Sequence, residues 1–315
     1  MSEGAPTIAV VIPAYNSAPY LAETLAAITG QSRPPDEIIV VDDGSTDNTA
    51  QIARDFGAPV RCISIDNGGQ GRARAIGIEK AASDWIALCD SDDLWRPDHL
   101  QRRLQLLQRY PSAQMTFSDF YSFGPNADPE HYLLSEAPDG WLERWAVRDD
   151  AGFYRLKQSY PAILAFNPAY LSGVMFRRDS YHAMGGFNNE FSRWIGEDSE
   201  FMRRFSALEQ VVFVGDTRQT WGYRRHANNY SLIQWRNINA KADILDALLA
   251  RGTVPKRYVR ITESERDLVR CRAFDQACWE KAHCEIDALY RKLPPTARSG
   301  KRSLKRYLAK LRVSL

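Results

Sequence analysis

The stretch WIALCDSDDLWRP, from Trp85 to Pro97, places three carboxylates within four positions, directly behind an apolar run. The apolar part is typical of a buried strand, and Asp90, Asp92 and Asp93 follow it. Like charges this close destabilise one another, and burying them without a partner would cost still more free energy. A bound metal cation would resolve that conflict. The stretch therefore predicts a buried strand that ends at a metal site.

Apolar runs and helical patterns alternate through the first third of the chain. Strands are expected at residues 8–13, 37–43, 60–65 and 85–90. Helices are expected around residues 21–28, within residues 44–56 with Ile52 and Phe56 on one face, at about 71–82 and from Pro97 onward. Ser45 or Thr46 is the expected N-cap of the second of these helices. Near-continuous apolar strands separated by helices predict an α/β fold, with a mostly parallel sheet that has helices on both faces.

Polar side chains follow each of the four predicted strands. In open α/β sheets, ligands lie beyond the carboxyl ends of the strands, so these residues are expected to converge on one site. They are Tyr15 and Asn16, Asp42 and Asp43, Asp66 and Asn67, and Asp90 to Asp93.

The composition is that of an ordinary soluble protein, with 44% hydrophobic and 25% charged residues in 315 positions. This length allows one large or two modest domains. The formal net charge of +2 conceals an asymmetry, because nine basic residues and no acidic residue lie between Ala288 and the C-terminus. The rest of the chain is net acidic. The basic balance therefore gives no reason to expect a nucleic-acid partner.

Cysteine usage and the N-terminal residues favour a cytoplasmic protein. None of the five cysteines forms a CxxC pair, which is typical of free thiols in a reducing compartment. The first residues lack the basic and apolar pattern of a secretory signal. The uncharged stretch Gln158–Phe176 contains two prolines and an asparagine, so we expect a buried strand and loop there and not a membrane-spanning helix.

Six motifs occur in order along the chain: VVIPAYN, VVDDGSTDNT, NGGQGRARAIG, LCDSDDLWRPDHL, GGFNNEFSRWIGEDSEFMRR and YRRHANNYS. In these motifs and their spacing the chain resembles the family 2 glycosyltransferases over about residues 7–231. The resemblance implies a GT-A fold, a Rossmann-like and mostly parallel α/β sheet that binds a nucleotide sugar. It also implies three parts: a nucleotide-sugar-binding half (1–122), an acceptor-binding and catalytic-base half (123–235) and a helical C-terminal extension with a basic tail (236–315).

A nucleotide-diphosphate sugar offers a flat base, a ribose diol and a charged pyrophosphate, so its site needs stacking, carboxylate acceptors and a cation. The resemblance implies that Asp92 is the direct metal ligand. Asp90 would contact ribose or metal-bound water, and His226 would face the metal or the diphosphate. Oxygen ligands suit Mn²⁺ or Mg²⁺. The other residues expected to bind the nucleotide sugar are Pro13, Tyr15, Asn16, Asp42, Asp43, Asn67, Arg74 and Ser91.

Two of these residues bear on the identity of the nucleotide. Tyr15 could stack on the base, and Asp43 could accept the imide N–H of uracil, which would favour UDP or dTDP donors. Arg74 matches an arginine of the family, whereas Ala75 stands where an asparagine is usual. This departure puts one donor contact in doubt but not the fold.

The resemblance assigns catalysis to Asp198 as the base, with Glu197 beside it. An inverting transfer needs a carboxylate on the face of the sugar opposite the leaving diphosphate, where it takes the proton of the attacking hydroxyl. The Q-x-x-R-W signature of processive synthases is absent. Transfer of one sugar per encounter to a glycan or lipid-linked acceptor, in the synthesis of surface polysaccharide, lipopolysaccharide or another glycoconjugate, is therefore the expected reaction.

Each motif also has a simpler interpretation. The DSDD segment could be a solvated turn, although an EF-hand loop is excluded because Trp95 and Gln101 stand where glycine and glutamate are required. The segment DDGSTD could merely cap a helix, a role expected of Asp47 in any case. Glu197 and Asp198 could be an acidic first helical turn. A single histidine is more often structural than a ligand.

Other functions stay open at the level of sequence. A nucleotidyltransferase acting on a sugar phosphate could use a similar sheet, but its glycine- and lysine-rich triphosphate loop is missing near Pro13. A non-catalytic nucleotide-sugar-binding protein is the second alternative. In the tail, an apolar stripe at helical spacing is interleaved with basic residues: Leu304, Tyr307, Leu308, Leu311 and Leu315. Such a stripe could rest on the inner face of an anionic membrane, and the alternatives are a solvated helix packed on the body or a disordered end.

Overall fold

The structure is a computed structural model that describes residues 6–193, 196–226, 234–298, 300–303, 305 and 306. These residues form two compact units. The first contains residues 1–193 and 201–227, and the second contains residues 194–200 and 228–315.

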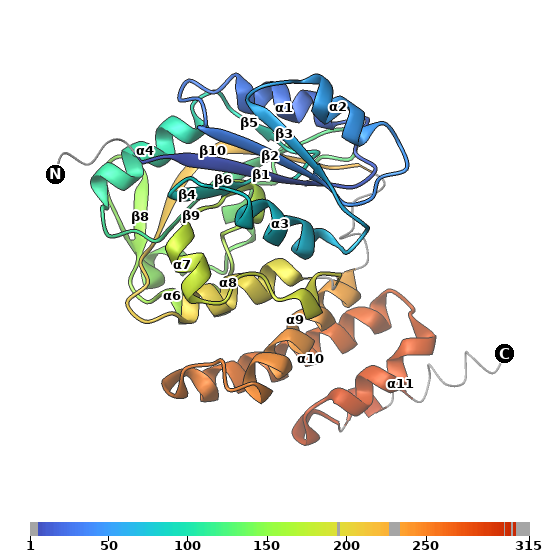
Figure 1. Ribbon diagram of the computed structural model, residues 1–315. Coiled ribbons are helices and arrows are strands. Elements are labelled where there is room, and N and C mark those ends of the chain that lie inside the picture. The colour runs from blue at the N-terminus through green and yellow to red at the C-terminus, as the bar shows by residue number, and fades with distance from the viewer. Residues whose placement is uncertain (1–5, 194–195, 227–233, 299, 304, 307–315) are drawn as a thin grey trace. The chain divides into compact units, whose positions relative to one another are not determined.

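A mixed and mostly parallel sheet forms the centre of the first unit (Figure 1). Its strand order is β3-β2-β1-β4-β9-β6-β10-β8-β7, and β5 pairs with β10. The strands are β1 (Ile8–Ala14), β2 (Glu37–Asp42), β3 (Val60–Ser64), β4 (Trp85–Leu88), β5 (Leu94–Trp95), β6 (Met115–Phe123), β7 (Ala146–Arg148), β8 (Phe153–Leu156), β9 (Met175–Arg177) and β10 (Phe213–Arg224). Strands β1 to β4 are mutually parallel, as are β6 and β10, whereas β9 runs antiparallel between β4 and β6.

Helices cover both faces of this sheet, with α1 and α2 on one side and α3 on the other (Figure 1). The helices of the chain are α1 (Leu21–Thr29), α2 (Thr49–Asp55), α3 (Gln70–Glu79), α4 (His99–Arg109), α5 (Trp141–Trp145), α6 (Ser159–Ala165), α7 (Arg178–Ala183), α8 (Glu197–Ala207), α9 (Gln234–Ala250), α10 (Val259–Trp279) and α11 (His283–Lys292). The short 3₁₀ helices are η1 (Leu133–Glu136), η2 (Leu171–Gly173), η3 (Asn189–Phe191), η4 (Lys256–Tyr258) and η5 (Pro295–Ala297).

The alternation of side chains along β1 explains why both faces are buried. Ile8, Val10 and Ile12 pack into the core beneath α1, whereas Ala9 and Val11 pack into the core beneath α3. Successive side chains of a strand point to opposite faces, so an entirely apolar strand needs cover on both sides. The α/β prediction with helices on both faces is therefore confirmed.

Helix α3 lies very close to the sheet at Gly77. A Cβ atom at this position would collide with the Cγ1 atom of Val11 and would lie 3.1 Å from the Cγ2 atom of Val41. Only glycine permits this approach without a shift of the helix. The close packing fixes the position of α3 over β1 and β2.

The second unit has its own apolar core between α10 and α11, formed by Phe274, Ala277, Ile286, Leu289, Tyr290 and Leu293. Arg270 of α10 is almost fully buried and donates hydrogen bonds to Asp243 and Asp246 of α9, both at 2.6 Å. The helical C-terminal region expected from the sequence is therefore present.

Two local predictions were wrong. The helix α2 begins at Thr49 with Asn48 as N-cap residue, and neither Ser45 nor Thr46 is its cap. Asp47 accepts hydrogen bonds from the backbone N–H and hydroxyl of Thr49, and this local bond sets the start of the helix.

The stretch Gln158–Phe176 is not only strand and loop, because α6 and η2 occupy much of it and β9 begins only at Met175. All six positions 159–164 of α6 are buried, so its residues lack the polar face that would mark a surface helix. Within the part of the chain that the structure describes, we find no helix whose length and hydropathy would suit a membrane span.

All five residues of the apolar stripe in the basic tail lie outside the residues that the structure describes: Leu304, Tyr307, Leu308, Leu311 and Leu315. Among the described tail residues, Arg302 and Lys305 pair with Asp275 of α10 at 2.8 and 3.0 Å, and Arg306 pairs with Asp287 of α11. These pairs favour the packed helix over the membrane surface as the place of this part of the tail. Membrane binding by the tail stays a prediction.

Candidate active site

The carboxyl ends of β1, β2 and β4 meet at one edge of the sheet. Register places Ala14 beside Asp42 and Val11 beside Leu88, so the residues that follow these strands start from the same edge (Figure 1). The convergence expected from the sequence is therefore present in the first unit. It brings together Asp42, Asp43 and the acidic segment from Asp90 to Asp93.

Asp90 and Asp92 have different partners. The buried guanidinium of Arg74 on α3 lies 2.6 Å from the Oδ1 atom of Asp90. The Nε2 atom of His226 lies 3.0 Å from the Oδ2 atom of Asp92, and the ring of Tyr20 stacks on the imidazole with centroids 5.0 Å apart. Both pairs join segments that are distant in sequence, which indicates that the acidic segment is built for a defined geometry.

Asp93 is the most deeply buried carboxylate of the segment. Burial first, and then the charges of Asp92 and Asp90, raise the pKa of Asp93 well above its ordinary value. Its Oδ1 atom accepts the backbone N–H of Arg224 at 3.0 Å, and the Thr24 hydroxyl donates to its carbonyl oxygen. Asp93 therefore anchors the acidic segment to β10 and α1.

Arg224 completes this anchor. Its Nε atom donates to the carbonyl oxygen of Asp92 at 2.6 Å, and its Nη2 atom lies 2.6 Å from the Oε2 atom of Glu23. The sequence suggested that Arg224 and Arg225 pair with phosphate or with acidic neighbours, and Arg224 does pair with Glu23, but it offered no specific signal for Tyr20 or Thr24 as supports of the site. An arginine after an aromatic strand is common, and only the pairing of β10 with β5 brings Arg224 to Asp92.

The residues present fit a divalent cation. Burial, and then the charge of Asp90, raise the pKa of Asp92, and the neighbouring His226 offsets only part of this effect. Carboxylate oxygen and imidazole nitrogen are both ligands of Mn²⁺-type ions. Among the described residues, no group of three or more His, Cys, Asp or Glu side chains is placed to hold a metal alone. Asp92 and His226 therefore suit a site in which a bound diphosphate supplies further oxygens.

Asp43 is buried, and both of its carboxylate oxygens accept backbone hydrogen bonds. The N–H groups of Gly68 and Gly69 donate to Oδ1 and Oδ2 at 2.7 and 2.8 Å, and the side chain of Asn67 donates to the backbone carbonyl of Asp43 at 3.0 Å. Asp43 therefore holds the loop before α3 and does not cap α2. A carboxylate has about four acceptor sites, so Asp43 has the capacity to accept a hydrogen bond from a ligand N–H as well.

The remaining predicted donor residues play distinct local roles. Tyr15 is half exposed, whereas Pro13 is buried within β1. Asn16, in a left-handed conformation with φ of 49°, accepts the backbone N–H of Thr46 through its Oδ1 atom. Asp42 accepts the backbone N–H of Ser45, and the hydroxyl of Ser91 bonds to that of Ser17 at 2.7 Å. Of this set, Tyr15 and Asn16 are exposed, whereas Pro13 and Asp42 are buried.

Glu197 and Asp198 begin helix α8 and belong to residues 194–200, which group with the second unit. Both are partly buried, and the Oδ1 atom of Asp198 accepts the backbone N–H of Ser199 at 2.6 Å. Acidic side chains in a first helical turn are favoured by the helix dipole. The simpler interpretation of these residues therefore holds, and it leaves a catalytic role for Asp198 untested.

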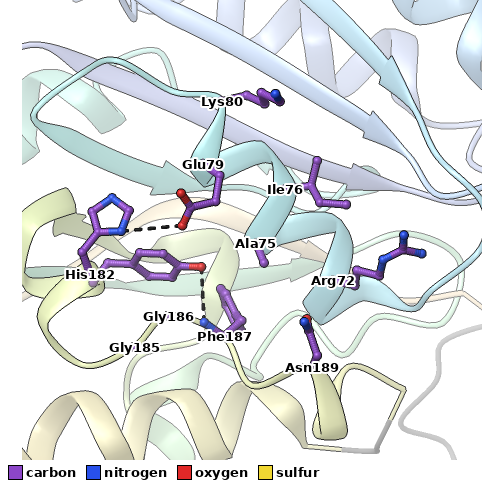
Figure 2. Close-up of a pocket in the computed structure, with 11 residues that line it drawn as sticks. Arg72, Ala75, Ile76, Glu79, Lys80, His182, Gly185, Gly186, Phe187 and Asn189 are labelled. Carbon is purple, nitrogen blue, oxygen red and sulfur yellow. Dashed lines mark hydrogen bonds and ion pairs between the residues drawn. The ribbon is translucent and has the colours of Figure 1, made fainter.

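A cavity of about 460 Å³ lies on the outer side of α3 in the first unit (Figure 2). Arg72 and Glu79 of α3 line one wall, and the Nδ1 atom of His182 lies 3.6 Å from a carboxylate oxygen of Glu79. None of the acidic residues from Asp90 to Asp93 borders it. This cavity is therefore separate from the carboxylate site.

Comparison with known proteins decides the family. The family model "Glycosyl transferase family 2" matches residues 9–211, which is well over half of the chain. The chain belongs to this family. A curated relative of the family 2 glycosyltransferase is the glycosyltransferase GlyG of Streptococcus pneumoniae serotype 4, which is 26% identical over 230 residues, or 70% of this chain and 72% of GlyG.

Two solved structures confirm the GT-A fold of the family 2 glycosyltransferase. S. aureus TarS, in complex with UDP-GlcNAc, superposes with a TM-score of 0.61 at 15% identity, covering 96% of this chain and 79% of TarS. The mannosyltransferase PcManGT of Pyrobaculum calidifontis, in complex with GDP-Man and Mn²⁺, gives a TM-score of 0.60 at 18% identity, covering 98% of this chain and 81% of PcManGT. The protein is thus a glycosyltransferase.

Proposed function

We propose that the protein transfers one sugar from a nucleotide-diphosphate sugar, with UDP as the preferred nucleotide, to a hydroxyl of a glycan or lipid-linked acceptor, and that it inverts the anomeric configuration. We further propose surface polysaccharide, lipopolysaccharide or another glycoconjugate as the product. The observation that carries the proposal is the pair of Asp92 and His226, 3.0 Å apart, beside the Asp90–Arg74 pair at the strand ends.

Asp92 and His226 would hold a divalent ion, Mn²⁺ or Mg²⁺. When bound, such an ion offsets the negative charge that grows on a leaving diphosphate. Burial and the charge of Asp90 raise the pKa of Asp92. A bound cation would favour the ionised carboxylate, which supports this role. The solved complex of PcManGT with GDP-Man and Mn²⁺ supports the same class of ligand.

Binding of the donor is assigned to residues at the strand ends. Tyr15 is open enough to stack on a base, and Asp43 is held rigidly by Gly68 and Gly69 with acceptor capacity to spare. A fixed carboxylate of this kind can accept the imide N–H of uracil. The UDP-GlcNAc bound by TarS is the second ground for proposing UDP as the nucleotide.

Asp198 is assigned the role of base, which takes the proton of the acceptor hydroxyl as it attacks C1 of the sugar. Transfer with inversion needs only one such group, because the diphosphate leaves without protonation. Glu197 precedes it in the sequence. Arg74 would hold Asp90 in an orientation toward the ribose.

The experiment is a comparison of Asp92→Ala and Asp198→Asn with wild type, using UDP-sugars and titration calorimetry with and without Mn²⁺. Asp92→Ala should remove most of the Mn²⁺-dependent gain in UDP affinity. Asp198→Asn should leave UDP affinity within a few-fold but lower transfer by a factor of about 100 or more. Asp139→Asn, at an exposed site, is the matched control and should change neither quantity.

The two results are independent of each other. Unchanged Mn²⁺-linked affinity in Asp92→Ala would remove the metal site from this segment. Near-normal turnover of Asp198→Asn would require another base. Formation of a product with retained configuration, read by NMR of the anomeric proton, would reject inversion.

A further inference from the structure

The loop from Asn67 to Gly71, here called the donor loop, leads into α3 and is held on one side by Asp43. The backbone N–H groups of Gly68 and Gly69, both in the donor loop, donate to the two carboxylate oxygens of Asp43. The donor loop is therefore fixed to the end of β2 by charge-assisted hydrogen bonds, which are about twice as strong as neutral ones.

The other side of the donor loop is held by residues 186–193, here called the strap. The hydroxyl of Ser192 donates to the carbonyl of Gly68 at 2.8 Å, and the N–H of Gly71 donates to the carbonyl of Ser192 at 3.3 Å. The guanidinium of Arg193 donates to the carbonyl of Asn67. Three hydrogen bonds thus join two segments that are more than a hundred residues apart in sequence.

The contact leaves no space for a side chain on the donor loop. Gly69 has a φ of 94°, and a Cβ atom built there would lie 2.8 Å from the carbonyl carbon of Ser192 and would overlap its oxygen. Both the left-handed conformation and the close approach therefore require glycine. Such packing transmits a displacement of the donor loop directly to the strap.

The first half of the strap borders a cavity beside α3. The cavity of about 460 Å³ lies between α3 and the residues Gly186, Phe187 and Asn189 (Figure 2). The three hydrogen bonds between the strap and the donor loop are made by Ser192 and Arg193, at the other end of the strap. Ser192 is itself almost fully buried, and its hydroxyl bond lies at the centre of the contact.

The donor loop leads to residues proposed to bind the donor, and the strap leads to the proposed base. The donor loop runs into α3, where Arg74 pairs with Asp90. The strap is followed in the sequence by Glu197 and Asp198. A donor that settles on Asp43 and the donor loop therefore acts on the segment that precedes the assigned base.

We propose that Ser192 is a positioning residue that couples donor binding at the donor loop to the strap and so to the chain that carries Asp198. The inference rests on the proposed roles of Asp43 and Asp198. The hydroxyl of the buried Ser192 is bonded to the carbonyl of Gly68, so no contact with the donor or the acceptor is assigned to it. It acts through the carbonyl of Gly68 and the placement of the strap.

The first test is hydrogen exchange of two segments, residues 66–72 and 186–193, with and without UDP and Mn²⁺. In wild type, UDP with Mn²⁺ should slow exchange in both segments. In Ser192→Ala, UDP should still slow exchange in residues 66–72, whereas protection of residues 186–193 should be largely lost. Ser159→Ala is the matched control, because its hydroxyl also donates to a distant backbone carbonyl, that of Val211, at 3.1 Å.

The second test is steady-state kinetics of the same variants. Ser192→Ala should lower kcat about five-fold while the UDP dissociation constant stays within about three-fold, the loss expected for one hydrogen bond that orders a catalytic segment. A merely structural role would lower the melting temperature and leave UDP-dependent protection and kcat unchanged. Ser159→Ala should show that second behaviour.

Equal UDP-dependent protection of residues 186–193 in wild type and Ser192→Ala would overturn the coupling. So would a Ser192→Ala variant whose kcat matches that of Ser159→Ala. Wild-type protein that shows no protection by UDP in either segment would reject the proposed donor site itself. Failure of the coupling is thereby distinguished from failure of the proposed function.

Discussion

Asp119 of β6 should make the protein less stable at neutral pH than at mildly acidic pH. Its side chain is 4% exposed, and its Oδ1 atom accepts the backbone N–H of Phe120 at 2.8 Å and that of Leu134 at 3.3 Å. Burial outweighs these bonds and raises the pKa of Asp119 from 3.8 to about 6. The folded protein therefore binds the Asp119 proton more tightly than the unfolded chain does.

The sign of the effect follows from linkage. Between pH values near 4 and 6 the folded state keeps the Asp119 proton while the unfolded state has lost it, so stability falls as pH rises through this window. The difference between 3.8 and about 6 corresponds to about 3 kcal/mol of unfolding free energy, lost in full above the folded-state pKa. Substitution by asparagine removes the titration but keeps the Oδ1 acceptor.

The assay is the melting temperature of wild type and Asp119→Asn across the same pH range, with Asp139→Asn as control. The melting temperature of Asp119→Asn relative to wild type should rise by about 6 °C or more between the acidic and the neutral end, at roughly 2 °C or more per kcal/mol. An amide N–H₂ without an acceptor would lower the stability of the variant at every pH. The change with pH is therefore the diagnostic quantity, and a difference that stays constant with pH would refute the reasoning.

Two further predictions concern the metal site and the helix α3. His226→Ala should weaken Mn²⁺-dependent UDP binding about ten-fold and Mg²⁺-dependent UDP binding much less, because Mg²⁺ prefers oxygen ligands. Calorimetry with each ion measures the two affinities. Equal losses of affinity with both ions would contradict a ligand role for the imidazole. Gly77→Ala should cost about 1–3 kcal/mol of unfolding free energy, because its Cβ atom would press on Val11 beneath α3. Chemical denaturation measures the loss, and an unchanged midpoint would show that α3 can move away from the sheet.

Local pattern was sufficient where one segment decides its own structure. The apolar runs at β1, β2, β3 and β4 and the polar residues behind them depend only on neighbouring residues, so strand positions and the convergent edge were predicted correctly. Where several polar residues compete for one helix start, the pattern was not decisive. Asp47, and not Ser45 or Thr46, makes the local bond at α2.

Partners across the fold were beyond the reach of pattern. The spacing of the carboxylates was enough to group Asp90, Asp92 and Asp93. It could not show that Asp90 pairs with Arg74, that Asp92 pairs with His226 or that Asp93 is the most deeply buried of the three. These facts depend on how α3 and β10 pack against the end of β4. Packing between distant segments is a property of the whole core and not of any one window of residues.

The sequence by itself determined the strand-and-helix alternation, the acidic strand end and, through its ordered motifs, the glycosyltransferase family. Only the tertiary structure decided that Asp43 holds the donor loop and that Ser192 closes it from the other side. The physical reason is the separation along the sequence over which each kind of interaction acts. Periodicity and capping act over a few residues, whereas the register of β5 on β10 and the contact of the strap with the donor loop join residues more than a hundred positions apart.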